Sequence, residues 1–89
     1  MRRSKLETYI DILNALARKG PLKLTHVMYK ANVNCNVLKE DLGFLIKQNL
    51  VEERTIARQH VVFTVTQRGV SVLNQFQQLT QMFPVIEEA

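Results

Sequence analysis

The chain has 89 residues, 46% of them hydrophobic, which predicts one folded domain and excludes a disordered chain. No apolar run approaches the roughly 20 residues that a membrane span needs, and charged residues interrupt the stretch where a secretory signal would lie. The lone cysteine, Cys35, cannot form an internal disulfide. We therefore expect a cytoplasmic protein that does not contact a membrane.

The net charge of +4 is unevenly distributed along the chain. Residues 1–50 carry nine lysines and arginines against four acids, whereas residues 51–89 carry three against four. A basic first half suits a polyanion such as nucleic acid, although a basic solvated surface explains the charge alone equally well. Two widely separated histidines and the lack of a glycine-rich phosphate loop predict no enzyme, metal, cofactor or small-molecule ligand.

The first predicted helix begins after Ser4 and ends at Gly20. Ser4 and Glu7 have the spacing of a capping box, and a glycine before a proline is a typical helix stop. Apolar residues at helical spacing predict one buried face, made of Leu6, Tyr9, Ile10, Leu13, Leu16 and Ala17. Ile12 lies off this stripe, so it either covers a second element or is exposed.

A short strand over 22–24 is predicted next, followed by two short helices. Thr25 is a suitable N-cap for a helix over about 26–31. Asn34 is a suitable N-cap for a helix over about 35–48 that Asn49 ends. The expected inner face of this second helix consists of Leu38, Leu42, Leu45 and Ile46.

The rest of the chain predicts a hairpin and a final helix. Strands are expected over 50–54 and 60–65, with Val61, Phe63 and Val65 on one face. Thr66 then caps a helix over about 67–83. The order is α-β-α-α-β-β-α, a mainly α protein with a small antiparallel β-sheet (α+β).

This order is typical of a winged helix-turn-helix, in which two helices joined by a tight turn precede a hairpin. We assign residues 1–83 to a single winged-helix domain that includes a C-terminal dimerisation helix over about 67–83. Residues 84–89 form a short tail.

Several stretches carry a family resemblance: residues 9–16, 25–33, 38–45 and 50–52, and the strand-to-helix segment FTVTQRG at 63–69. Together they resemble the small archaeal winged helix-turn-helix proteins of the transcription-regulator and chromatin-protein type, over about residues 6–80. The resemblance implies that a homodimer binds double-stranded DNA. It places the second helix of the motif in the major groove and the hairpin wing on the backbone or minor groove.

The second helix of the motif is the candidate reader of bases. Asn36, Lys39 and Gly43 share its outer face, where asparagine suits adenine and lysine suits guanine or phosphate. The alternative is an ordinary solvated face, which Glu40 and Asp41 favour because acids repel phosphate.

Other polar residues complete the expected DNA surface. An arginine at the wing tip, Arg58, suits a minor groove, and residues flanking the first helix of the motif suit phosphates. Tyr29 is either such a contact or part of the core. Arg2, Arg3 and Lys5 form a basic arm that either tracks phosphates or frays. The expected DNA-binding set is Lys23, Thr25, Tyr29, Lys30, Asn34, Asn36, Lys39, Gly43, Lys47, Arg54 and Arg58.

The last helix carries apolar residues at heptad spacing. They either belong to the core of the domain or form a seam with a second copy. We expect a homodimer because so many large apolar groups at the end of a small domain are rarely left exposed. The seam residues are Val72, Phe76, Leu79, Phe83 and Ile86, and Tyr9 and Ile12 of the first helix are expected to complete the interface.

These features predict a non-enzymatic, duplex DNA-binding protein that acts as a transcriptional regulator or chromatin-associated protein. Its expected partners are double-stranded DNA and a second copy of itself. The alternative is a protein-protein interaction winged-helix module within a larger complex, which Glu40 and Asp41 support.

Overall fold

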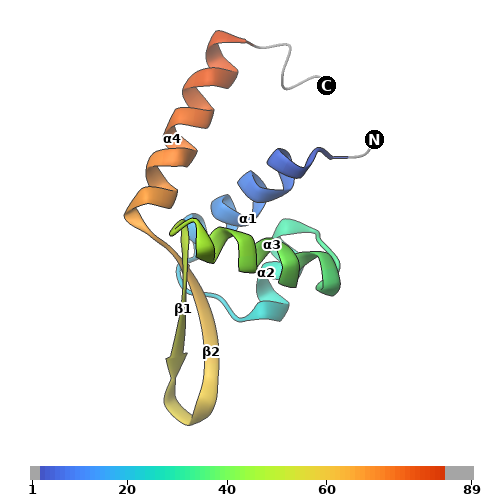
Figure 1. Cartoon of the computed structure of the whole chain (residues 1–89), viewed down its shortest axis with the longest axis vertical. Helices are drawn as coiled ribbons and strands as arrows, with labels where there is room; N and C mark the ends of the chain where they lie inside the picture. The colour runs from blue at the N-terminus through green and yellow to red at the C-terminus, as the bar shows by residue number, and fades with distance from the viewer. Residues whose placement is uncertain (1–2, 84–89) are drawn as a thin grey trace.

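The structure, a computed structural model, describes residues 3–83 as a three-helix body with two projections (Figure 1). The hairpin leaves the body on one side and the last helix on the other, so the molecule measures 46 × 27 × 21 Å. The elements are α1 (Lys5–Lys19), α2 (Leu24–Ala31), α3 (Cys35–Lys47), β1 (Val51–Ile56), β2 (His60–Val65) and α4 (Gln67–Met82). This order confirms the predicted fold class, apart from the short strand over 22–24.

Helix α1 has the predicted ends. The backbone N–H of Glu7 donates to the Ser4 hydroxyl at 3.1 Å, and the Glu7 carboxylate accepts from the Ser4 backbone N–H at 2.9 Å, which completes the capping box. Gly20 has φ 72°, a left-handed conformation that a side chain would strain. Because α1 packs against α2, α4 and β2, its buried side is broader than predicted and includes Ile12. Leu6 and Ala17, expected to be buried, are exposed.

The segment before α2 differs most from the prediction. Leu22 forms a single β-bridge with Phe63 through two hydrogen bonds of 3.0 and 2.8 Å, and no strand over 22–24 follows. The helix begins at Leu24 with Lys23 as its N-cap, so the predicted cap at Thr25 is wrong. The reason is tertiary: Leu24 packs against the core from the first position of the helix, which pulls the helix start towards the bridge.

The turn between α2 and α3 and the end of α3 follow the prediction. Asn32 ends α2 in the left-handed region with φ 56°, and the Asn34 side chain accepts from the Val37 backbone N–H at 3.0 Å. Asn49 has φ 62°, and the N–H of Leu50 donates to the Leu45 carbonyl at 2.9 Å, the pattern of a Schellman motif.

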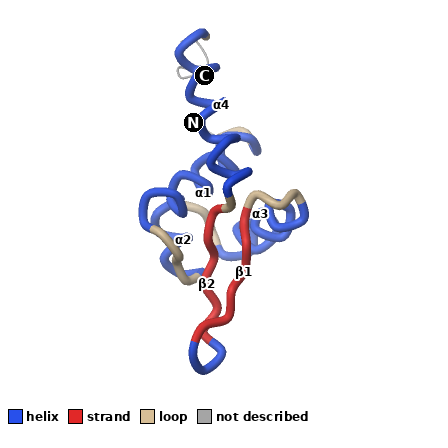
Figure 2. Tube along the Cα trace, turned by 90° about the vertical axis from the view of Figure 1, so that its left-hand side faces the viewer, coloured by secondary structure: helices blue, strands red, loops and turns tan. Residues whose placement is uncertain are grey.

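The wing is a two-stranded antiparallel hairpin (Figure 2). Its register runs from Val51 opposite Val65 to Ile56 opposite His60, so β1 is longer than the predicted strand. The tip is the short turn η1 (Ala57–Gln59), in which two consecutive residues have positive φ.

Helix α4 is attached at the base of the wing. The Thr66 hydroxyl accepts from the Gly69 backbone N–H at 3.0 Å, as predicted for an N-cap, and donates to the Asn49 carbonyl at 2.7 Å. A Cβ at Gly69 would collide with the Leu50 carbonyl and the Val65 side chain, so glycine is required there. The predicted helix stop at Pro84 lies outside the described residues. None of the helices within residues 3–83 is long and apolar enough to cross a membrane.

Candidate nucleic-acid interface

The outer face of α3 is open and polar. Asn36, Lys39, Gly43 and Lys47 are exposed together, because Leu38, Leu42 and Leu45 on the opposite face are buried in the core. Nothing lies within 4 Å of the position that a Cβ would occupy at Gly43. The predicted reader residues therefore share one accessible surface.

The two acids expected to weaken this surface lie differently. Glu40 is exposed, but Asp41 is 1% exposed and its Oδ1 is 2.6 Å from the Lys5 Nζ. The expectation that Asp41 would face a phosphate is wrong, since it follows Leu38 by three positions and belongs to the buried stripe. The three-residue spacing from Leu38 indicated that position 41 is buried. The acidic side chain favoured an exposed position instead.

Helix α2 contributes a second polar edge. Thr25 and Lys30 are exposed, and Tyr29 is 79% exposed, which excludes it from the core. A cleft of about 240 Å³ lies where α2, α3 and the wing meet. It is lined by Leu24, Lys39, Leu42, Gly43, Ile46, Glu53 and Phe63.

The wing carries mixed charge. Arg58 is exposed at the tip, as predicted. Arg54 lies 3.3 Å from Glu52 on the same strand, so part of its charge is compensated. Glu53 lines the same cleft as Lys39, which places an acid close to α3.

The basic arm expected at the start of the chain is bound to the body. Arg3 pairs with Asp11 and Lys5 pairs with Asp41, so neither extends freely towards DNA, and Arg2 lies outside the described residues. The carboxylate of Asp41 raises the pKa of Lys5 through a hydrogen bond.

Sequence reasoning missed a basic cleft between α1 and α2. Arg18, Lys19 and Lys30 line this cleft of about 490 Å³, and Asp11 is the one acidic residue among its lining residues. The signal in the sequence was the basic pair that ends the first helix.

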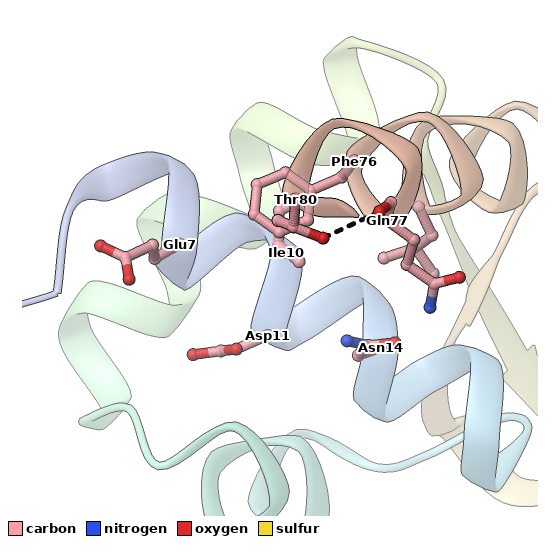
Figure 3. A pocket seen from close by; sticks show the side chains of 8 residues that line it. Glu7, Ile10, Asp11, Asn14, Phe76, Gln77 and Thr80 are labelled. Atoms are coloured by element: carbon pink, nitrogen blue, oxygen red, sulfur yellow. Dashed lines mark hydrogen bonds between the residues drawn. The ribbon is translucent and has the colours of Figure 1, made fainter. Parts of the chain in front are cut away.

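The expected seam on α4 divides into two parts. Val72 and Phe76 are partly buried and pack against the core of their own domain. Figure 3 shows Phe76, Gln77 and Thr80 of α4 facing α1 across a groove of about 330 Å³. Farther along, Leu79, Met82 and Phe83 are 48%, 71% and 50% exposed, respectively.

The two α1 residues assigned to the interface also separate. Ile12 is 0% exposed, so its assignment to a surface that meets a second copy is wrong. Tyr9 is partly buried and stacks on Phe44 with ring centroids 4.9 Å apart, and it shares an apolar groove with Val72. Ile86 lies outside the described residues.

Within residues 3–83 there is no group of three or more histidine, cysteine or acidic residues that could hold a metal ion. The His26 and His60 side chains are exposed on separate elements.

The whole described region matches a known family. A family model described as winged helix-turn-helix matches residues 2–83. A comparison with curated proteins gave no match.

Solved structures share the fold at low sequence identity. The DNA-binding protein Sso10a-2 from Sulfolobus solfataricus superposes with a TM-score of 0.82 at 20% identity, over 97% of this chain and 87% of that chain. The PcaV transcriptional regulator from Streptomyces coelicolor superposes with 0.79 at 17% identity, over 88% of this chain and 60% of that chain. A MarR family transcriptional regulator from Silicibacter pomeroyi gives 0.75 at 20% identity, over 86% and 56%. The chain therefore spans most of the first protein but little more than half of the two regulators.

Proposed function

We propose that this chain, which belongs to the winged helix-turn-helix family, binds double-stranded DNA as a transcriptional regulator or chromatin-associated protein and has no catalytic activity. One observation carries the proposal: the exposed side of α3 is open and carries two lysines against one acid, Glu40. Asn36, Lys39 and Lys47 are exposed on it, whereas Asp41 is turned inward and paired. Such a face suits the negatively charged edge of a duplex.

In the proposed complex, α3 enters the major groove. Asn36 and Lys39 reach base edges, and the absence of a side chain at Gly43 allows close backbone approach. Lys23, the N-cap of α2, and Lys30, in its last turn, contact phosphates on one side of the groove, while Arg58 reaches the backbone or minor groove from the wing tip.

The similar structures support this reading. The Sulfolobus protein is described as DNA-binding, and the Streptomyces and Silicibacter proteins are described as transcriptional regulators. The net charge of +4 adds a general attraction to DNA.

We further propose that the protein is a homodimer joined through the projecting end of α4. Leu79, Met82 and Phe83 expose large apolar surfaces beyond the three-helix body. Burying such surfaces against a second copy removes them from water and is favourable. In such a dimer, two α3 helices that meet one face of a duplex must lie about 34 Å apart, one turn of DNA, so the DNA site would be a pseudo-palindrome.

The rival function, a protein-interaction module, is favoured by acids near α3. Glu40 is exposed on that helix, Glu52 is exposed on the wing, and Glu53 borders the same cleft as Lys39. A basic protein surface would suit these carboxylates, whereas a duplex would be repelled by them.

A gel shift with random and candidate duplexes at two salt concentrations distinguishes the two functions. Replacing Lys39 and Lys47 by glutamine should weaken binding and reduce the salt slope by about 0.9 for each phosphate that is no longer neutralised. The control replaces Arg68 by glutamine, because Arg68 is exposed on α4 and lies outside the predicted site. No duplex binding by the wild type would favour the protein-interaction module, and an unchanged salt slope in the α3 variant would exclude α3 from the interface.

A further inference from the structure

Arg3 joins the start of α1 to the end of α2. Its Nη1 donates to the Asp11 Oδ2 at 2.7 Å and to the Ala31 carbonyl at 2.7 Å, and its Nη2 donates to the Asn32 carbonyl. The last carbonyls of a helix have no partner within the helix, so the guanidinium satisfies two groups that would otherwise need water. It also holds the turn that leads into α3.

Lys5 joins the start of α1 to α3 itself. Its ammonium lies 2.6 Å from the Oδ1 of Asp41, and the Oδ2 of that carboxylate has no hydrogen-bond partner in the described structure. Asp41 is almost fully buried. Burial of a carboxylate is strongly unfavourable without a compensating charge. Lys5 supplies that charge to Asp41.

An aromatic contact accompanies the ion pair. The Lys5 ammonium lies 5.8 Å from the centre of the Tyr9 ring, and Tyr9 stacks on Phe44 of α3. The apolar contacts between α1 and α3 therefore have a polar contact beside them. The ion pair adds a polar contact between the first residue of α1 and α3, and this contact is lost if α3 moves away from Lys5.

We propose that Lys5 and Asp41, supported by Arg3, are positioning residues for the DNA interface: they hold α3 in the register in which its outer face meets the duplex, and they do not contact DNA. This inference rests on the proposed function. Asp41 projects from the side of α3 opposite Gly43, so the pair acts on the helix from behind the interface.

A paired substitution separates positioning from plain stability. Lys5→Met alone leaves Asp41 buried and unpaired and should lower the melting temperature. Lys5→Met with Asp41→Leu replaces the pair by apolar groups, a change that often preserves or raises stability. We expect this double variant to melt at or above the wild-type temperature and still bind duplex DNA about tenfold more weakly, with the wild-type salt slope.

Two further variants complete the experiment. Lys5→Arg keeps the charge and should keep the affinity, and Arg68→Met is the control that removes one exposed positive charge outside the predicted site. If Lys5→Met with Asp41→Leu does not fold, Lys5→Gln with Asp41→Asn takes its place, because the two amides retain a hydrogen bond without charge.

Three results would overturn the inference. A folded double variant that binds like the wild type would leave the pair a purely structural role. A salt slope that falls by about one unit in Lys5→Met would mean that Lys5 itself contacts a phosphate. A wild-type protein that binds no duplex would contradict the proposed function as well, and it would be recognised before any variant is compared.

Discussion

The wing and the end of α4 project from opposite sides of the same body, but they expose opposite chemistry (Figure 1). The wing ends in Arg58 and exposes charged residues along β1, beside the apolar Ile56 and Val61. The end of α4 exposes Leu79, Met82 and Phe83. A projecting segment makes few packing contacts with its own domain. Its exposed side chains are therefore available to bind a partner. The contrast therefore indicates a charged partner for the wing and an apolar one for α4.

The two projections also share one base. Thr66 ends the wing, caps α4 and bonds to the Asn49 carbonyl, and Gly69 packs directly on Leu50. The body holds α3 between them. A substitution at this base should therefore disturb the structure of both projections. A substitution at the tip of one projection should disturb that projection alone.

Gly69→Ala should produce the largest effect. Its new Cβ would overlap the Leu50 carbonyl, a backbone atom that cannot move cheaply, and we expect the free energy of unfolding to fall by about 3 kcal/mol. Gly43→Ala is the matched control, because its Cβ meets open space and alanine favours a helix by about 1 kcal/mol. Urea unfolding measures both. Equal effects of the two substitutions would contradict the shared base.

Leu79→Glu should separate the dimer without unfolding the domain. Leu79 is half exposed, so a charge there costs the monomer little but would be buried unpaired in a dimer. Sedimentation should give twice the chain mass of 10.3 kDa for the wild type and 10.3 kDa for the variant. DNA affinity should fall as well, because two half-sites are no longer linked. Phe76→Glu is less informative, since Phe76 packs against its own core.

Gln78→Glu is the control for this experiment. It adds the same charge to an exposed neighbouring position and should leave the mass unchanged. A wild-type mass of 10.3 kDa at micromolar concentration would exclude the dimer.

The sequence was sufficient where structure is decided locally. The caps at Ser4, Asn34 and Thr66 and the left-handed stops at Gly20 and Asn49 depend on side chains within a few residues, and all five are present. The order of elements follows from them. The candidate reader residues on α3 were also predictable, because their exposure follows from the helical period.

The sequence was insufficient where distant elements decide. Leu24 begins α2 and packs against the core, and Ile12 is buried because α1 packs against three other elements. Lys5 and Asp41 lie 36 positions apart, so although the spacing from Leu38 places Asp41 on the buried side of α3, nothing local predicts that Lys5 is its partner. Pairing across elements is a tertiary property.

Substitutions at the wing tip should separate charge from backbone strain. Arg58 and Gln59 both have positive φ, at 57° and 64°, which glycine adopts without strain. Either residue changed to glycine should raise the free energy of unfolding by up to about 1 kcal/mol. Only Arg58→Gly should weaken DNA binding, and a gel shift beside thermal unfolding measures both. Equal DNA affinities for the two variants would remove Arg58 from the interface.

The smallest effect concerns the body that supports both projections. The Ser4 backbone N–H, which donates to the Glu7 carboxylate, lowers the pKa of Glu7 below its ordinary value of 4.5. A carboxyl with a lowered pKa stabilises the fold above its unfolded pKa, and that contribution is lost as the pH falls through the folded pKa. Glu7→Gln keeps the contact with Ser4 but does not titrate, so the stability difference between wild type and variant should shrink on acidification. Urea unfolding across the acid range measures it, and a difference independent of pH would contradict the role of the capping box. Because Glu7 lies on neither projection, the variant should keep the mass of the dimer and the affinity for DNA at neutral pH.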